Sequence, residues 1–349
     1  MAKVFLIFSI FFLSIFVSCK VDPEIIEPLP TGNLVEVIPE GWPNPVYTFS
    51  ANTISEDKFA LGRALFYEPM LSVDSTISCG SCHQQFAAFA QFGHGLSHGI
   101  YDRLGTRNAP GIFNINWHPL IMHDGGINHI ELQPLGPITN TLEMGGDINP
   151  VIAKLQASNK YKNLFKKAFG TDVITTQHMF RAMAQFMGLM YSYNSKYDSY
   201  KRKEDNVQFT DSELRGYSLF IANCNACHKE PLFSDFAFRS NGISVNINIK
   251  DSGRAHVTGL PQDKYKFKTP SLRNISRTAP YMHDGRFSTL DECLNHYTGV
   301  KPNLINLDPL LQNNGLLLSA QDKQDLIAFL NTLTDNKFLT DKRFANPNF

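Results

Sequence analysis

An internal repeat constrains the fold of this 349-residue chain more than any other feature. The segment APGIFNINWHPLIMHDG, residues 109–125, aligns with TPSLRNISRTAPYMHDG, residues 269–285, at a constant offset of 160 residues. Such a repeat marks one structural unit used twice, so the sequence predicts two related modules. We expect them to join near the charged, turn-like segment KRKEDN, residues 201–206. The identical pairs are Pro110 and Pro270, Asn114 and Asn274, Ile115 and Ile275, Met122 and Met282, His123 and His283, Asp124 and Asp284, and Gly125 and Gly285.

Each copy of the repeat lies downstream of one Cys-x-x-Cys-His motif, CGSCH at residues 79–83 and CNACH at residues 224–228. Two thiols at this spacing can form thioether bonds to one haem, and the adjacent histidine can bind its iron. The motifs therefore predict two covalently bound c-type haems. The predicted attachment residues are Cys79, Cys82, Cys224 and Cys227, and the predicted proximal iron ligands are His83 and His228.

Two other interpretations of the cysteine pairs fit less well. A redox-active dithiol of the thioredoxin type would follow a strand and would need no histidine. A zinc site built from both pairs would have four thiolate ligands and would leave His83 and His228 without a role. Only Cys293 lies outside both motifs and the N-terminal segment, and we interpret it as a small buried residue rather than a reactive thiol.

The first nineteen residues predict export. Lys3 precedes an apolar run over residues 4–17, which is shorter than the roughly 20 residues of a membrane span and typical of a signal peptide. The sequence FVSC that ends at Cys19 resembles a bacterial lipobox, so residues 1–19 are predicted to be a lipoprotein-type signal peptide and Cys19 the lipidation site. We therefore expect the mature protein on the periplasmic side of a Gram-negative envelope, held to the membrane only through the lipid.

Helical patterns predominate in the remainder of the chain, so we expect an all-α fold of two cytochrome c-like haem domains packed together, with few short strands. Residues 20–50 are rich in proline and glutamate and predict a tether and lead-in. The haem domains are expected at residues 51–204 and 205–349. The expected helices span Ser55–Phe66, Gln177–Tyr193, Asp211–Ile221 and Ala320–Thr332, and the best strand signal is Ile243–Ile249.

The formal charge of the chain excludes one class of partner. Lys plus Arg and Asp plus Glu both number 32, so nothing attracts the protein to nucleic acid.

Beyond the haem motifs, the chain contains RNAP at 107–110, QPLGPI at 133–138, LEM at 142–144, TPSLRN at 269–274 and APYMHDGRFSTL at 279–290. With these motifs it resembles the bacterial dihaem cytochrome c peroxidases, in particular the branch that includes the dihaem oxidases that mature methylamine dehydrogenase. The resemblance implies reduction of H2O2 at the N-terminal haem, with electrons delivered through the C-terminal haem by a cytochrome c or cupredoxin. Relatives are often homodimers.

The resemblance also implies the groups on the open sides of the haems. Gln133 and Glu143 correspond to the residues that assist peroxide cleavage, although Glu143 could instead be a solvated loop residue. His98, with His94 as the alternative, lies near the family position of a distal histidine at the first haem. Tyr297 stands where many relatives have an axial methionine at the second haem, and an anionic phenolate there would stabilise oxidised iron. His296 is the alternative ligand.

A calcium ion between the modules is a further family feature. Its ligands would be the Asn108 side chain and the backbone carbonyls of Thr278 and Pro280, because oxygen ligands suit this cation. Asn108 could instead cap a turn. His123 replaces the usual inter-haem tryptophan, and Trp117 is only a weak candidate for an electron relay.

Three functions remain open from the sequence. The first is a cytochrome c peroxidase. The second is a peroxide-dependent oxidase of a protein or small-molecule substrate, which Tyr297 favours. The third is a dihaem electron carrier without an open iron, and such a protein would show no spectral response to peroxide.

Overall fold

The computed structural model describes residues 34–300, 302, 304–312 and 315–347. The predicted signal peptide and Cys19 lie outside these residues. The described part is mainly helical, and its strands are the two-residue segments β1 (Phe238–Arg239) and β2 (Phe267–Lys268), which pair antiparallel. The predicted all-α class is therefore confirmed. Within the described residues, no helix is long and apolar enough to cross a membrane.

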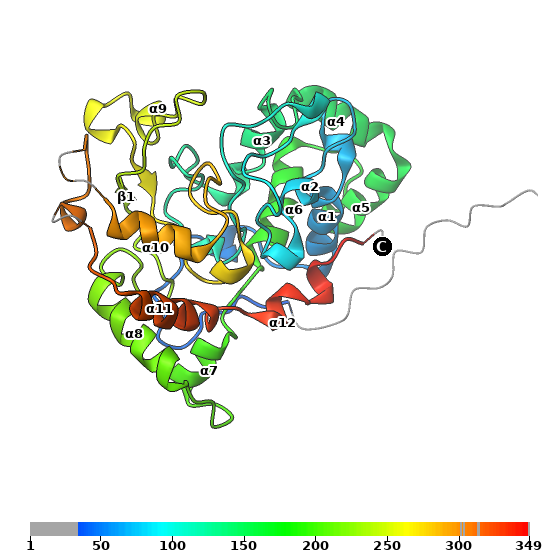
Figure 1. Ribbon diagram of the computed structural model, residues 1–349. Coiled ribbons are helices and arrows are strands. Elements are labelled where there is room, and N and C mark those ends of the chain that lie inside the picture. The colour runs from blue at the N-terminus through cyan, green and yellow to red at the C-terminus, as the bar shows by residue number, and fades with distance from the viewer. Residues whose placement is uncertain (1–33, 301, 303, 313–314, 348–349) are drawn as a thin grey trace, which may run out of the picture.

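The helices form two groups that lie beside each other (Figure 1). Short 3-10 segments and long loops connect them. The first group comprises α1 (Glu56–Phe66), α2 (Cys79–Cys82), α3 (Leu135–Thr139), α4 (Ile148–Ala157), α5 (Asn159–Phe169) and α6 (Thr176–Gly188). The second comprises α7 (Lys196–Arg202), α8 (Asp211–Asn223), α9 (Ala255–Thr258), α10 (Leu290–Thr298) and α11 (Ala320–Asn331), and α12 (Asn336–Leu339) follows.

Three of the four expected helices agree with α1, α8 and α11 to within two residues at each end. The fourth, α6, ends at Gly188 rather than Tyr193. It ends early because Asn114 binds the following segment: its backbone N–H donates to the Met190 carbonyl, and its side chain exchanges two hydrogen bonds of 2.9 Å with the Ser192 backbone.

The expected strand over Ile243–Ile249 is wrong. Residues 247–249 form a turn, in which the Asn246 side chain accepts a hydrogen bond from the Asn248 backbone N–H at 3.0 Å. Asparagine side chains favour turns because they can bond the backbone two residues on. This local bond overrides the alternating pattern that predicted a strand.

Each group of helices surrounds its own hydrophobic core, and each core contains one closely packed helix pair. In the first core α1 contacts α6, and a Cβ atom added at Gly62 would lie 2.0 Å from the Ala182 carbonyl oxygen. In the second core α8 contacts α11, and a Cβ atom at Gly216 would lie 1.9 Å from the Asp325 carbonyl oxygen. Glycine is therefore needed at the contact in both pairs.

The C-terminal segment returns to the first core. Phe338, Leu339 and Phe344 are buried there, and the Tyr67 hydroxyl donates to the Phe344 carbonyl at 2.7 Å. The chain thus crosses between the cores twice, once before α7 and once before α12. The domain boundary between residues 204 and 205 stays a prediction, and the last residues pack with the first core rather than the second.

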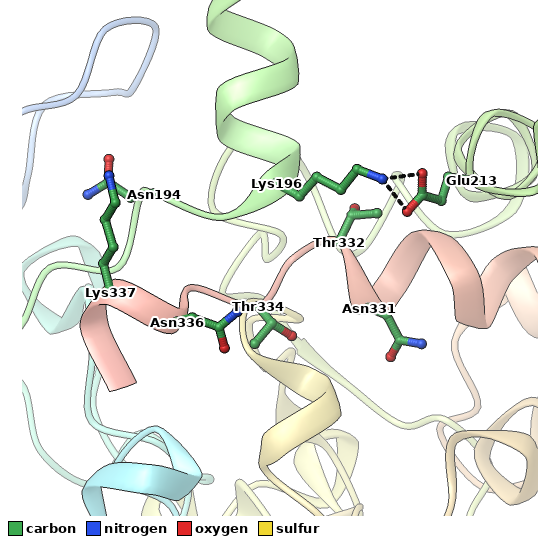
Figure 2. A pocket seen from close by; sticks show the side chains of 8 residues that line it. All are labelled: Asn194, Lys196, Glu213, Asn331, Thr332, Thr334, Asn336 and Lys337. Carbon is green, nitrogen blue, oxygen red and sulfur yellow. Dashed lines mark hydrogen bonds and ion pairs between the residues drawn. The ribbon is translucent and has the colours of Figure 1, made fainter. Parts of the chain in front are cut away.

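A polar cavity of about 430 Å3 lies where the chain crosses between the cores (Figure 2). Lys196 at the start of α7 donates to both carboxylate oxygens of Glu213 on α8, at 2.6 and 2.7 Å. Thr332, at the end of α11, lines the same cavity. The ion pair therefore ties the first crossing to the second core.

Replacing Gly62 with alanine should push α1 away from α6. We expect a loss of about 1–3 kcal/mol in unfolding free energy, the usual cost of overpacking. Far-UV circular dichroism in urea would measure it. Alanine at Lys166, an exposed residue of α5, is the control and should leave the unfolding midpoint nearly unchanged. An unchanged midpoint for Gly62→Ala would contradict the close contact.

Candidate active site

The two repeated segments meet at the boundary between the cores. The Asn108 backbone N–H donates to the His283 carbonyl at 2.8 Å, and the Lys268 backbone N–H donates to the His123 carbonyl at the same distance. Asn108 and Lys268, like His123 and His283, are 160 residues apart. An approximate two-fold symmetry therefore relates these two hydrogen bonds, as the sequence repeat implies.

Arg107 strengthens this boundary. Its Nε and Nη2 atoms donate to the two carboxylate oxygens of Asp251 at 2.6 and 2.8 Å, and its Nη1 donates to Asp124 at 2.6 Å. Arg254 adds a bond of 2.7 Å to the Asp124 carbonyl. Arg107 was missed by the sequence analysis, although it lies in the RNAP motif directly before Asn108.

Both haem motifs form a single helical turn. The His83 N–H donates to the Cys79 carbonyl, and the His228 N–H donates to the Cys224 carbonyl, each at 2.9 Å. Residues at positions i, i+3 and i+4 of a helix share one face. The turn therefore presents two thiols and one imidazole on the same side, as attachment of one haem requires.

The histidines of both motifs are oriented in the same way. His83 Nδ1 lies 2.6 Å from the Phe89 carbonyl, and His228 Nδ1 lies 3.1 Å from the Pro270 carbonyl. A carbonyl oxygen that accepts a hydrogen bond from Nδ1 fixes the tautomer of the imidazole and leaves Nε2 available to bind a metal. Burial lowers the pKa of both histidines, which keeps them neutral, the form that binds iron. The donor set fits a haem.

The cysteines fit thioether attachment better than the competing interpretations. Burial raises the pKa of Cys79 to about 12, of Cys82 to about 11 and of Cys224 to about 12, whereas redox-active dithiols have lowered values. All four motif thiols are free. Among the described residues, no three His, Cys, Asp or Glu side chains are grouped as a metal site would require.

Glu143 lies beside the first haem motif. Its negative charge adds to burial in raising the pKa of Cys82, which means that the carboxyl is close to that thiol. Burial also raises the pKa of Glu143 itself, while a 2.8 Å hydrogen bond from Asn140 and the charge of Arg107 act in the opposite direction. The Ile100 backbone N–H holds the Glu143 carbonyl at 2.8 Å. A half-buried carboxyl in this place can serve as an acid or base.

The other predicted groups around the first motif differ in how firmly they are held. Gln133 is half-buried at the end of the 3-10 segment Ile130–Leu132, and its amide makes no hydrogen bond to any described residue. His98 is exposed, and its carbonyl accepts a weak bond of 3.7 Å from Cys82 Sγ. The rings of His94 and His98 lie 4.5 Å apart. The loop with both histidines is therefore adjacent to the motif.

Tyr297 lies near the second haem motif, at the end of α10. Burial raises its pKa to about 12, and the thiols of Cys224 and Cys227 add to the increase, so the hydroxyl is close to both. His296 is occupied elsewhere, because its Nε2 lies 3.0 Å from the Asn241 carbonyl. Of the two candidate ligands, the structure directs Tyr297 toward the motif.

The predicted calcium ligands lie in the same boundary region. Asn108 is buried, and its side-chain amide donates to the Gly95 carbonyl at 2.9 Å. Its backbone contacts His283, which follows Thr278 and Pro280 by a few residues. The backbone bond to His283 thus brings Asn108 to the same boundary as the segment with Thr278 and Pro280.

The surroundings of Trp117, His123 and Cys293 show how these three residues are held. Trp117 is buried, donates to the Pro43 carbonyl at 2.8 Å and packs edge-on against Trp42, with ring centroids 5.0 Å apart. His123 is half-buried with Nε2 3.0 Å from the Asn108 carbonyl, and desolvation lowers its pKa to about 4. Cys293 is half-buried, and burial raises its pKa to about 12, as expected for an unreactive thiol.

Comparisons with known proteins identify the family of the chain. A family model described as di-haem cytochrome c peroxidase matches residues 56–206. The methylamine utilization protein MauG of Methylorubrum extorquens is 32% identical over 304 residues, which cover 84% of this chain and 82% of that protein. This chain belongs to the dihaem cytochrome c peroxidase family. The cytochrome c551 peroxidase of Nitrosomonas europaea is 32% identical over 296 residues, covering 80% of this chain and 81% of that protein.

Solved structures agree with the fold. A MauG-like protein associated with microbial copper homeostasis superposes with a TM-score of 0.80 at 32% identity, over 89% of this chain and 98% of that one. The diheme peroxidase BthA from Burkholderia thailandensis has a TM-score of 0.71 at 22% identity over 84% of this chain and 90% of that one, which supports the fold alone. The predicted family, two c-type haems and peroxidase-type oxidoreductase activity are thereby confirmed.

Replacing Asp251 with asparagine should loosen the boundary between the cores, because Arg107 loses its charged partner. We expect a loss of about 2–3 kcal/mol at neutral pH, as for hydrogen bonds to charged groups. Burial acts to raise the pKa of Asp251, but the hydrogen bonds and the charge of Arg107 lower it by more. The pKa of Asp251 therefore lies below the ordinary value of 3.8. A carboxyl group whose pKa is lowered by folding stabilises the fold fully above pH 3.8. This contribution to the unfolding free energy is lost as the pH falls through the pKa of the folded state.

Urea unfolding of the holoprotein would measure this effect. The difference between Asp251→Asn and wild type should shrink as the pH is lowered below about 4. Glu204→Gln, which removes an exposed partner of Arg202, is the control and should leave the stability nearly unchanged. Equal stability of Asp251→Asn and wild type at neutral pH would refute the role of Arg107.

Proposed function

We propose that this protein reduces hydrogen peroxide to water at the haem held by His83, with electrons that enter through the haem held by His228. The environment of Glu143 is the observation that supports this division of roles most directly. It is a half-buried carboxyl group beside the first motif, and burial raises its pKa. Cleavage of the O–O bond requires such a group, because a proton must move from one oxygen to the other.

The residues around the first motif have separate tasks in this proposal. Glu143 removes the proton from the nearer oxygen of hydrogen peroxide and returns it to the farther oxygen, which leaves as water. Gln133 orients the peroxide with its free amide. The haem, when bound, supplies the iron that binds the peroxide and the electrons that cleave it. Two electrons and two protons convert each H2O2 into two molecules of water.

His98 is the proposed distal ligand of the resting iron at the first haem. His98 itself is exposed, although its neighbours Ser97 and Gly99 are buried. An exposed histidine can withdraw when peroxide enters. His94 remains the alternative, since its ring lies 4.5 Å from the ring of His98.

Tyr297 is the proposed axial ligand of the second iron. This proposal also favours a second candidate function, a peroxide-dependent oxidase, because a phenolate stabilises iron in higher oxidation states. Three relatives are named methylamine utilization protein MauG. An electron carrier without catalysis is less well supported, since it has no use for the carboxyl group of Glu143.

The remaining parts of the proposal concern the surroundings of the enzyme. A small redox protein, a cytochrome c or a cupredoxin, is the proposed electron donor. Calcium bound by Asn108 and the carbonyls of Thr278 and Pro280 would brace the boundary between the cores. The protein would work in the periplasm as a homodimer, held by a lipid on Cys19 through the tether and lead-in of residues 20–50.

Replacing Glu143 with glutamine should lower the rate of peroxide reduction by about 100- to 10,000-fold, the usual contribution of a general acid–base group. The haem absorption spectrum should stay the same, because glutamine has the same shape. Stopped-flow spectroscopy with H2O2 and a reduced donor would measure both. Glu131→Gln is the matched control, since Glu131 bonds Tyr47 and lies near Arg181, and it should keep full activity. Full activity in Glu143→Gln would rule out the proposed role.

The pH dependence of the rate of peroxide reduction provides a second comparison of the wild type with Glu143→Gln. Glu143 must be ionised to accept the proton, and burial raises its pKa. The rate should therefore fall as the pH is lowered, with a midpoint above the ordinary glutamate value of about 4.3. This acid limb should be absent from the residual activity of Glu143→Gln.

Replacing Tyr297 with phenylalanine should change the absorption and electron paramagnetic resonance (EPR) signals of one haem and leave the other unaltered. The ferric state of that haem should become easier to reduce, because an anionic oxygen ligand is lost. Spectroelectrochemical titration would measure the shift. Tyr281→Phe, a tyrosine that donates to the Ile275 carbonyl, is the control. Identical spectra for Tyr297→Phe and wild type would exclude ligation.

A further inference from the structure

A group of polar side chains beside the second haem motif has no part in the proposed reaction. The hydroxyls of Tyr197 on α7 and Tyr217 on α8 both donate to the carboxylate of Glu230, the latter at 3.0 Å. Lys201 donates to the Tyr217 hydroxyl at 3.0 Å. Two tyrosines therefore share one carboxylate.

This group connects the second motif with the surface. The ring of Tyr197 packs against the ring of Phe233 with centroids 4.8 Å apart, and the Phe233 carbonyl lies 3.3 Å from His228 Nδ1. Tyr197 is 3% exposed, whereas Lys201, at the other end of the group, has a side chain that is 45% exposed. The rings of Tyr197 and Tyr217 are 6.3 Å apart. A continuous set of contacts thus runs from His228 to the outside.

A phenol that gives up one electron must also release its proton, because the phenol cation is a strong acid. A carboxylate already bonded to the hydroxyl can take that proton along the existing hydrogen bond. Tyr67 lacks this arrangement: it lies near Cys79 in the first module but donates to a backbone carbonyl. Tyrosine–carboxylate bonds also occur in the first module, between Tyr161 and Glu68 and between Tyr47 and Glu131. The pair at Glu230 differs because the ring of Tyr197 packs against Phe233, whose carbonyl lies 3.3 Å from His228 Nδ1.

We propose that Tyr197 and Tyr217 are a redox-active pair that passes single electrons from the surface near Lys201 to the haem held by His228. The inference rests on the proposed function, because hydrogen peroxide is the oxidant. In each step one electron would leave the pair through Tyr197, the tyrosine nearer the haem, Tyr217 would replace it, and the tyrosine left oxidised would pass its proton to Glu230. This leaves one neutral tyrosyl radical and a protonated carboxyl. A donor at the surface then returns one electron, Glu230 returns the proton, and the phenol is restored.

The test uses the holoprotein with both haems, mixed with one equivalent of H2O2 without a donor and frozen within the first turnover. The EPR spectrum should contain a tyrosyl signal, which narrows when the protein is made with ring-deuterated tyrosine. The double variant Tyr197→Phe and Tyr217→Phe should lose this signal. Glu230→Gln, which keeps hydrogen-bonding groups but takes up no proton, should also lose it. Tyr217→Phe alone should weaken it if the double variant does not fold.

Tyr161→Phe is the matched control, because the Tyr161 hydroxyl donates to Glu68 at 2.6 Å in the first core. It should retain the signal of the wild type. Haem content and the ferric absorption spectrum should be the same in all variants, which separates loss of the radical from loss of the cofactor.

A tyrosyl signal that persists in the double variant would overturn the inference. So would a radical that ring-deuterated tyrosine does not alter, since that result would place the oxidation on tryptophan. Consumption of the peroxide without any tyrosyl signal would overturn the inference and leave the proposed function intact. If the holoprotein consumed no peroxide at all, the proposed function would fail first and this inference with it.

Discussion

The exchange of backbone hydrogen bonds between the two repeats is the interaction on which the rest of the structure depends. Asn108 and Lys268 each donate to the carbonyl of a repeat histidine in the other module. Backbone bonds of this kind fix the distance and the angle between two units more tightly than surface side chains do. They hold the two Cys-x-x-Cys-His turns in a defined relation, so an electron transferred between the haems would cross a constant gap.

Charge reinforces this arrangement and connects it with the chemistry. Arg107 binds Asp124 and Asp251, which come from the two modules, and its charge also lowers the pKa of Glu143. One guanidinium group therefore acts both on the boundary between the cores and on the proposed acid–base residue. Without this charge, burial would raise the pKa of Glu143 further.

The sequence predicted the parts of this protein that local patterns encode. The repeat at an offset of 160 residues identified His123 and His283, whose carbonyls accept the hydrogen bonds across the boundary. The spacing within each haem motif predicted two thiols and a histidine that serve one haem. The sequence could not predict contacts between distant segments. The early end of α6 depends on Asn114, the role of Arg107 depends on Asp251, and the Tyr197–Glu230 bond joins residues whose proximity no pattern indicates.

The return of the C-terminal segment has a consequence for the order in which the protein folds. Phe338 and Phe344 complete the first core, but the whole second group of helices lies between them and α6 in the chain. The first core therefore cannot be completed by residues 56–188 alone, and its closure waits until the chain has returned from the second core.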